Sequence, residues 1–212
     1  MKISIPKYTI QEEKINSITH LIGGFLSLIG IFILIRQTKT SKELLCSMIF
    51  STSLTFLYFI SGIYHGLPKK SKWKKLFRLI DHCNVYILEL ATFLPICFIT
   101  LEPSIGTIYF LILLFFTIIG IILNCIVLDK VQLTSVIIHL LVGWSVLLIT
   151  PLLYEKIKLN GLVLLFLGGI IYTIGAILYR LGIKQKYMHC IFHIFCLMGS
   201  LCHYLLIYIY IL

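Results

Sequence analysis

The sequence is poor in charged residues, and that scarcity excludes a soluble globular domain. Of its 212 residues, only 12% are charged while 59% are hydrophobic. A soluble domain of this length could not hide so much apolar surface from water. Runs of about 20 apolar residues instead match the hydrocarbon thickness that a transmembrane helix must cross. The composition therefore predicts an integral membrane protein.

Three further features that the sequence lacks narrow the class of membrane protein. There is no series of short alternating strands, which excludes a transmembrane barrel, and no low-complexity linker to a second domain. Residues 1–14 are polar and precede no short apolar region with a cleavage site, so we expect no cleaved signal peptide. The seven cysteines form no CxxC pair and mostly fall in apolar runs, where they pack as small hydrophobic residues. An all-α fold in one membrane domain, residues 1–212, is predicted.

Seven apolar segments predict a polytopic bundle of seven transmembrane helices. They cover approximately residues 17–35, 44–67, 79–101, 105–128, 133–153, 159–181 and 187–211. With seven crossings, thirteen of the eighteen Lys and Arg residues fall on the side of the N-terminus, six of them between Lys69 and Arg78. Because cytoplasmic loops carry an excess of basic residues, the N-terminus is predicted to be cytoplasmic and the C-terminus outside.

The net charge of +10 at first suggests a nucleic-acid partner. Lysines that concentrate in loops, however, orient a membrane protein and meet anionic lipid headgroups. We therefore expect a multi-pass protein of the cell membrane, plasma or inner, whose partners are membrane lipids and not nucleic acid.

Ionisable side chains within membrane spans are costly, so each is a candidate for a functional site. Those nearest the predicted cytoplasmic face come from four different spans: His20, His65, Asp81, His82, His189 and His193. His189 and His193 are spaced i and i+4, which places both imidazoles on one helix face. Ser61 has the same spacing to His65 and could support it.

Other polar residues lie deeper. His139 and His203 are separated along their helices from this group, and we predict that each makes an interhelical hydrogen bond. Glu89 lies two turns beyond Asp81 and has no evident cationic partner in the sequence.

His65, His189 and His193 form a suitable ligand set for Zn²⁺, and three ligands with an open fourth position are typical of a catalytic zinc site. Zinc would lower the pKa of a bound water towards neutrality. Asp81 could hold that water, act as general base or orient a histidine, and Ser61 could hydrogen-bond the water or a substrate carbonyl. The alternative is an intramembrane hydrogen-bond network or proton path without metal.

Motifs at these positions resemble the haemolysin III family, within the progestin and adiponectin receptor superfamily and related to alkaline ceramidases. They are E-x-x-N-S-x-T-H from Glu13 to His20, S-G-I-Y-H from Ser61 to His65, R-x-x-D-H from Arg78 to His82, Gly143-Trp144, G-G-I-x-Y-x-x-G from Gly168 to Gly175, H-x-x-x-H from His189 to His193, and G-S-x-C-H from Gly199 to His203. They occur in the family's order along almost the whole chain.

The resemblance implies seven helices, a cytoplasmic N-terminus and an intramembrane zinc held by His65, His189 and His193. It also implies that Asp81 and Ser61 are partners of the metal-bound water. The chain departs from the family pattern at residues 89–95, where Glu-Leu-Ala-Thr-Phe-Leu-Pro replaces a small, polar stretch ending in Tyr-Thr-Pro. That difference alters the wall of the third helix and bears on the substrate more than on the metal.

Three functions are compatible with these features. The first is a zinc-dependent hydrolase of lipid amide or ester bonds, or a factor in membrane-lipid homeostasis. The second is a pore-forming cytolysin, as the family name suggests, although a permanently hydrophobic chain offers little for it. The third is a receptor-like regulator in which zinc serves structure only.

Overall fold

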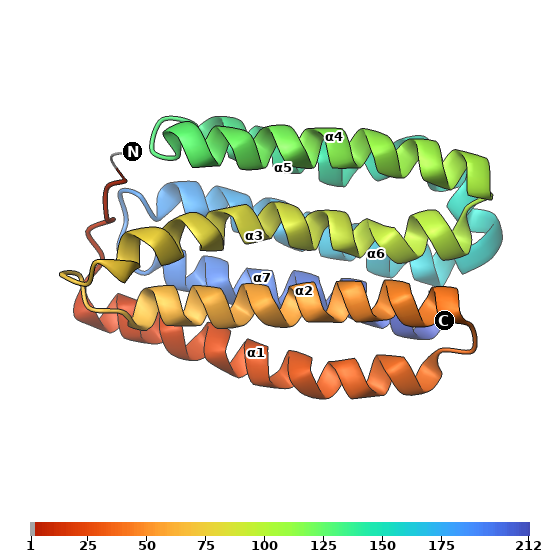
Figure 1. The fold of residues 1–212 in the computed structure, drawn as a ribbon, viewed down its shortest axis with the longest axis horizontal. Helices are drawn as coiled ribbons and strands as arrows, with labels where there is room; N and C mark the ends of the chain where they lie inside the picture. Colours follow the sequence, from red (N-terminus) through yellow and green to blue (C-terminus); the bar gives the residue numbers. More distant parts are fainter. Residues whose placement is uncertain (1–2) are drawn as a thin grey trace.

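A computed structural model describes residues 3–212, so the predictions made for Met1 and Lys2 lie outside the described residues. The helices lie roughly along one long axis and form a bundle (Figure 1). In chain order they are α1 Ile10–Gln37, α2 Ser41–Gly66, α3 Trp73–Pro95 with the π-helical turn η1 Ile96–Thr100, α4 Pro103–Val127, α5 Gln132–Trp144, the 3₁₀ turn η2 Ser145–Ile149, α6 Thr150–Leu181, and α7 Met188–Leu206 with the π-helical turn η3 Ile207–Ile211. Since residues 3–212 contain no strand, the all-α prediction is confirmed.

The first two helices begin with the same local signal. Thr9 accepts a hydrogen bond from the backbone N–H of Glu12, and the Glu12 carboxylate binds the backbone N–H of Thr9. Thr40 and Glu43 repeat this reciprocal arrangement before α2. Such a capping box satisfies two backbone donors that a helix start leaves free. It explains why α1 begins seven residues before the predicted span, at Ile10 and not at residue 17.

Within residues 3–212, six helical segments are long and apolar enough to span a membrane. The fifth of these, Gln132–Leu181, has 50 residues, which as one straight helix would be about 75 Å long against a hydrocarbon core of about 30 Å. Its helical geometry breaks at Lys158, whose φ is 57°. Figure 1 shows the chain turning back near the start of α6, at the end of the bundle opposite the N-terminal segment.

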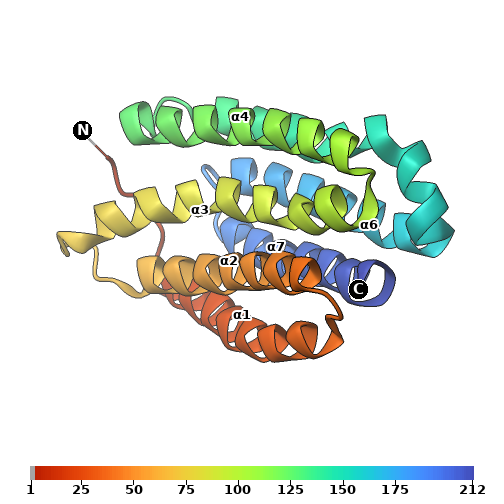
Figure 2. The same cartoon turned by 45° about the vertical axis from the view of Figure 1, so that its right-hand side comes forward.

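The helices are arranged in layers. Figures 1 and 2 place α4 and α5 along one side, α3 and α6 in the middle, and α2, α7 and α1 on the other side. The N-terminal segment and the C-terminus lie towards opposite ends of the bundle in both views.

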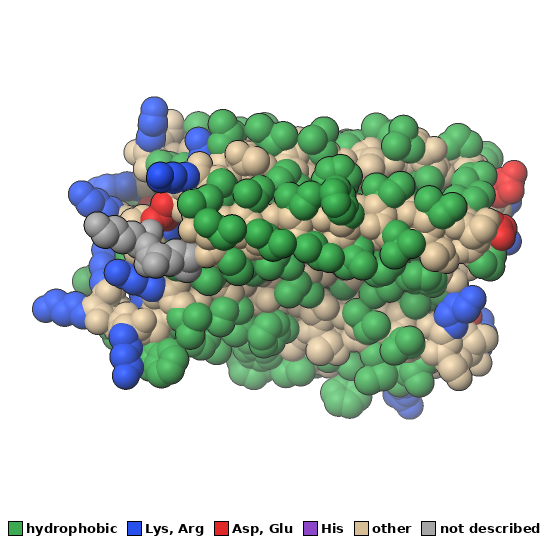
Figure 3. Space-filling view, turned by 45° about the horizontal axis from the view of Figure 1, so that its top comes forward, with side chains coloured by type: hydrophobic (Ala, Val, Ile, Leu, Met, Phe, Trp, Pro, Cys, Tyr) green, Lys and Arg blue, Asp and Glu red, His purple; other side chains and the backbone are tan. Residues whose placement is uncertain are grey.

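The surface of the bundle is largely apolar, while several charged side chains are buried inside it. Large apolar side chains such as Phe32, Leu141 and Leu148 are 68–82% exposed, and the face in Figure 3 is a band of apolar side chains with basic residues gathered mainly at one end. Lys74 and Arg78, by contrast, are almost completely buried. An apolar exterior suits contact with lipid, and buried ionisable groups in such a bundle point to an internal site. The chain is a multi-pass membrane protein.

Candidate metal centre

Three histidines from two helices meet inside the bundle. His65 lies in the last turn of α2, and His189 and His193 lie one turn apart at the start of α7. One ring nitrogen of each is within 4.8 Å of the others, and all three residues are buried. The structure thus brings together the three residues that the sequence suggested as ligands, in a group that could hold a metal ion.

The first turns of α1 orient these imidazoles. The Nδ1 atom of His65 lies 2.7 Å from the Oε2 atom of Glu13. The Nδ1–H group of His193 donates to the backbone carbonyl of Asn16 at 3.2 Å, because a carbonyl oxygen can only accept. Each contact leaves Nε2 as the nitrogen facing the cluster. A metal-binding histidine commonly has its second nitrogen fixed in this way by a carboxylate or a carbonyl.

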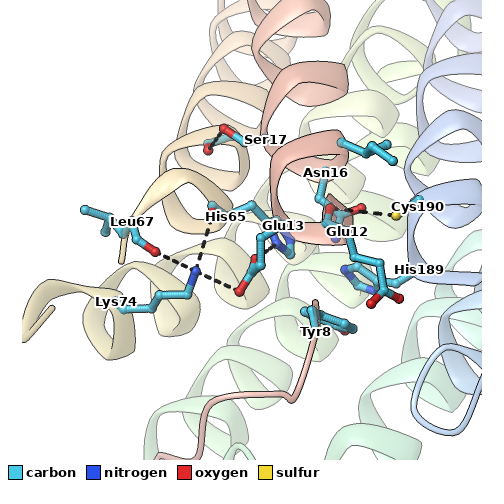
Figure 4. Close-up of polar contacts among 12 residues, drawn as sticks. Tyr8, Glu12, Glu13, Asn16, Ser17, His65, Leu67, Lys74, His189 and Cys190 are labelled. Atoms are coloured by element: carbon cyan, nitrogen blue, oxygen red, sulfur yellow. Dashed lines mark hydrogen bonds and ion pairs between the residues drawn. The ribbon is translucent and has the colours of Figure 1, made fainter. Parts of the chain in front are cut away.

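Lys74 completes the support of His65, as Figure 4 shows. Its ammonium group lies 2.9 Å from the Oε1 atom of Glu13 and donates to the carbonyls of His65 and Leu67 at 3.2 and 2.8 Å. Those carbonyls belong to the end of α2, where helix carbonyls lack partners within the helix. One buried cation therefore both caps α2 and balances the carboxylate that orients His65.

The geometry and the donor set could hold a metal ion. Two imidazole nitrogens bound tetrahedrally to zinc lie about 3.3 Å apart, given Zn–N bonds of about 2.0–2.1 Å. The Nε2 atoms of His189 and His193 are 3.3 Å apart. The Nε2 atom of His65 is buried and has no protein partner, although buried polar atoms nearly always have one. Both observations suit three neutral imidazoles converging on one cation.

Aromatic rings enclose the cluster. The ring of His20 stacks on His193 with centroids 3.6 Å apart, and Tyr8 stacks on His189 at 4.8 Å. Burial raises the pKa of the Tyr8 phenol above its ordinary value, so the phenol stays neutral at physiological pH. His20, one of the histidines that the sequence placed at this face, therefore packs against the group.

The start of α7 is fixed by α1 as well. Tyr187, the residue before the helix, has a left-handed φ of 64°, which is uncommon for a bulky residue. Its backbone N–H donates to the Oε1 atom of Glu12 at 2.7 Å. Glu12 thus positions α7, the helix that carries His189 and His193. Its neighbour Glu13 orients the ring of the third histidine, His65.

A cavity of about 670 Å³ adjoins the cluster and extends along the bundle. Ser61, Asp81, His189 and His193 all line it. At the Nδ1 atom of His65, the residue that Ser61 was predicted to support, the contact comes from Glu13. Ser61 and Asp81 are instead placed beside the space that a small molecule would occupy.

The N-terminal segment lies along the same end of the cavity. Ser4 and Tyr8 line it, and Ser4 is held by the buried guanidinium of Arg78 and by Asp129. Arg78 and Asp129 form an ion pair of 2.5 Å. Partial burial alone would raise the pKa of Asp129, but the hydrogen bonds from Arg78 and Ser4 outweigh burial and hold that pKa below its ordinary value. This carboxylate is therefore ionised at neutral pH.

The two deeper histidines do make interhelical contacts. The Nε2 atom of His203 in α7 is 3.2 Å from the carbonyl of Leu165 in α6. His139 in α5 contacts Glu89 in α3 at 2.7 Å. The contact supplies the partner of Glu89 that the sequence did not reveal, and both histidines lie outside the three-histidine group.

Sequence reasoning missed Glu13 and Lys74 as parts of the centre. Glu13 was visible in the E-x-x-N motif, but its acceptor role depends on the packing of α1 against α2. Lys74 was counted among the basic residues of a loop, whereas it lies in the first turn of α3 and is fully buried. All seven cysteines are free, as predicted.

Comparison with known proteins finds relatives along almost the whole chain. Residues 8–204 match the family model described as haemolysin-III related. The chain is 32% identical to Hemolysin-3 of Bacillus cereus over 206 residues, covering 96% of this chain and 93% of that protein. It is also 32% identical to a Hemolysin-3 homolog of Bacillus subtilis (strain 168) over 196 residues, covering 91% of each.

A more distant similarity extends to animals. The monocyte to macrophage differentiation factor of Homo sapiens is 24% identical over 227 aligned residues, which cover 97% of this chain and 87% of the human protein. All the residues of the candidate metal centre fall inside the matched range.

Proposed function

The chain belongs to the haemolysin-III-related family, and on that premise we propose that it is a zinc-dependent hydrolase of amide or ester bonds in membrane lipids. One observation carries the proposal: two of the three converging imidazoles, those of His189 and His193, line a cavity together with a carboxylate, Asp81, and a hydroxyl, Ser61. A metal-binding set, a candidate base and room for a small molecule are the parts that metal-assisted hydrolysis requires.

His65, His189 and His193 would hold the ion, with Glu13 and the Asn16 carbonyl fixing two of the rings. When bound, zinc supplies Lewis acidity that polarises a carbonyl and acidifies a water molecule. Asp81 takes a proton from the attacking water as general base. The oxygen of that water bonds to the carbonyl carbon, the C–N or C–O bond breaks, and Asp81 returns the proton to the leaving nitrogen or oxygen. Ser61 donates a hydrogen bond to the substrate carbonyl.

The membrane arrangement we propose has seven crossings with the N-terminus in the cytoplasm. The break at Lys158 divides Gln132–Leu181 into two antiparallel halves, each long enough for one crossing. The basic cluster between Lys69 and Arg78 then lies at the cytoplasmic face, near the cluster of histidines. A lipid bond near the headgroup would reach this depth from the inner leaflet.

The test is lipid turnover by detergent-purified protein, with zinc content measured in the same samples. Asp81→Asn should lower turnover by about 10²- to 10⁴-fold and leave zinc bound. The His65→Ala, His189→Ala, His193→Ala triple variant should lose both turnover and zinc. His203→Ala is the matched control, because it removes a cavity-lining histidine of α7 outside the cluster. Lipid turnover that persists in the triple variant would contradict the proposed hydrolase activity.

A purely structural zinc is the second candidate, and a specific contact favours it. The ligands come from α2 and α7, and α1 holds two of their rings through Glu13 and Asn16, so one ion would fasten three helices. On this account zinc removal lowers thermal stability, while Asp81→Asn changes neither stability nor any lipid pool. Turnover that depends on Asp81 separates the two candidates.

A further inference from the structure

A second polar site lies in the same cavity, away from the histidine cluster. Glu89 of α3 and His139 of α5 form a hydrogen-bonded pair with 2.7 Å between Oε2 and Nδ1, which is an ion pair when the imidazole is protonated. Both line the cavity, and their side chains keep 15% and 22% of their surface exposed. Ionisable residues at this depth in a membrane protein are expensive and mark sites by default, and nothing in the hydrolysis above uses this pair.

One atom of each side chain is available to a ligand. Within residues 3–212, Glu89 Oε1 and His139 Nε2 have no hydrogen-bonding partner, since the pair contact uses the other oxygen and the other nitrogen. Gly143 of α5 faces the free oxygen, and a methyl group built there would lie 3.5 Å from it. Tyr86 covers one face of the imidazole with ring centroids 3.9 Å apart. The pair is thus held by its neighbours and open along the cavity.

The position of the pair sets the distance between the two polar sites. Glu89 follows Asp81 by eight residues on the same helix, which corresponds to about 12 Å along the axis. Beyond Glu89 the cavity is lined mainly by apolar side chains, including Phe93, Ile96 and Val146, with Thr92 and His203 as polar exceptions. Moving away from the histidine cluster, the cavity is therefore polar at the cluster, polar again at Glu89 and His139, and mainly apolar beyond them.

An unsubstituted acyl chain fits this sequence of environments poorly. Passing the pair, it would remove water from Glu89 Oε1 and His139 Nε2 and return no hydrogen bond, and desolvating a charged group without compensation is costly. A hydroxyl group donates its single proton to the carboxylate and accepts from the Nε2–H group of a protonated His139, so it satisfies both atoms of the charged pair; beside a neutral ring whose Nδ1–H faces Glu89 it satisfies one of them. A carbonyl cannot donate to Glu89, and an ammonium cannot accept from His139.

We propose that Glu89 and His139 form a subsite for a hydroxyl group carried part-way along a fatty acyl chain. The substrate class of the hydrolase would then be lipids whose acyl chain bears a hydroxyl near its middle, about 12 Å from the bond that is cleaved. This inference rests on the proposed function for the placement of that bond at the cluster, but the binding of the hydroxyl itself requires no turnover.

The experiment measures binding without hydrolysis. Octadecanoic acid and its analogue with a mid-chain hydroxyl compete with a fluorescent fatty acid for Asp81→Asn protein in lipid nanodiscs. We expect the hydroxylated acid to bind about 10- to 100-fold more tightly, the equivalent of one hydrogen bond to a charged group. An analogue with its hydroxyl beside the carboxyl should show no such advantage.

Three variants assign the preference to the pair. The double variant Glu89→Leu, His139→Leu replaces the pair by apolar side chains, which buried pairs often tolerate, and should reverse the preference. Gly143→Ala keeps the pair but places a methyl group against Glu89 Oε1, and should reduce it. Glu155→Gln, an exposed carboxylate on α6, is the control and should behave as its parent.

The outcomes separate this inference from the hydrolase. Equal affinities for the two acids, no binding of either, or an unchanged preference in the double leucine variant would overturn the subsite, even if turnover is observed. A hydroxyl preference that the double variant loses would support the subsite, even if no lipid is hydrolysed.

Discussion

Two glutamate–histidine pairs in this bundle share the same contact but have different surroundings. Glu13–His65 and Glu89–His139 each join Oε2 to Nδ1 at 2.7 Å. In the first pair the second carboxylate oxygen binds Lys74, and the free imidazole nitrogen faces two further histidines. In the second pair the carboxylate oxygen faces Gly143, and no Lys or Arg lies within ion-pair distance among the described residues.

The two pairs consist of the same residue types, but their different surroundings give them different roles. Where a cation balances the carboxylate, the pair is a rigid support that leaves one imidazole nitrogen able to bind a metal ion. Where the cation is missing and a cavity takes its place, the pair keeps hydrogen-bonding capacity for a ligand. The environment of a buried ion pair therefore decides its role more than the pair does.

The largest expected effect comes from removing the cation of the first pair. Lys74→Met leaves Glu13 without its ammonium and the end of α2 without its cap, which should lower the free energy of unfolding by about 3–5 kcal/mol. Denaturation of purified protein in detergent measures it. The double variant Glu89→Leu, His139→Leu should be neutral or more stable. A Lys74→Met protein as stable as wild type would remove the distinction between the pairs.

The loss of stability on metal removal should be nearly as large. A ligand present at a thousandfold excess over its Kd stabilises the folded state by about 4 kcal/mol. Chelation of wild type should therefore lower the thermal midpoint clearly, and re-addition of zinc should restore it. The shift should be the same for the double leucine variant, because Glu89 and His139 lie outside the metal centre. A smaller shift in that variant than in wild type would mean that both pairs support the ion.

Glu13→Gln should have an intermediate effect. Loss of a carboxylate that orients a metal-binding histidine typically costs 10- to 100-fold in metal affinity, and competition with a coloured chelator would report it. Glu89→Gln, the same change in the other pair, should leave zinc affinity unaltered. Equal losses in the two variants would contradict the assignment made here.

The smallest effect concerns the N-terminal segment beside the cavity. Asp129→Asn should speed hydrogen exchange at the backbone amide of Ser4, which Asp129 binds, several-fold at neutral pH while zinc affinity stays unchanged. Because the pKa of Asp129 is lowered on folding, its contribution is present above the unfolded pKa and is lost only as the pH falls through the folded value. Wild-type exchange at Ser4 should therefore show no Asp129-dependent change between pH 5 and pH 8; a marked one would refute this role.

Much of the fold could be read from hydrophobic runs, while the partners of the polar residues could not. The apolar segments predicted where the helices lie. The capping residues Thr9 with Glu12 and Thr40 with Glu43 could also have predicted the residues at which α1 and α2 begin. Helical spacing alone put His189 and His193 on one face. The contacts of Glu13 with His65 and of Glu89 with His139 join residues 52 and 50 positions apart. Such pairings depend on how helices pack, which periodicity within a single helix does not encode.

The central claim is that His65, His189 and His193 hold one metal ion together. Metal analysis of detergent-purified wild type beside the triple alanine variant tests it most directly, with His203→Ala as the control. We expect close to one zinc per chain in wild type and in the control, and none in the triple variant. Equal zinc in wild type and the triple variant would contradict the account at its centre.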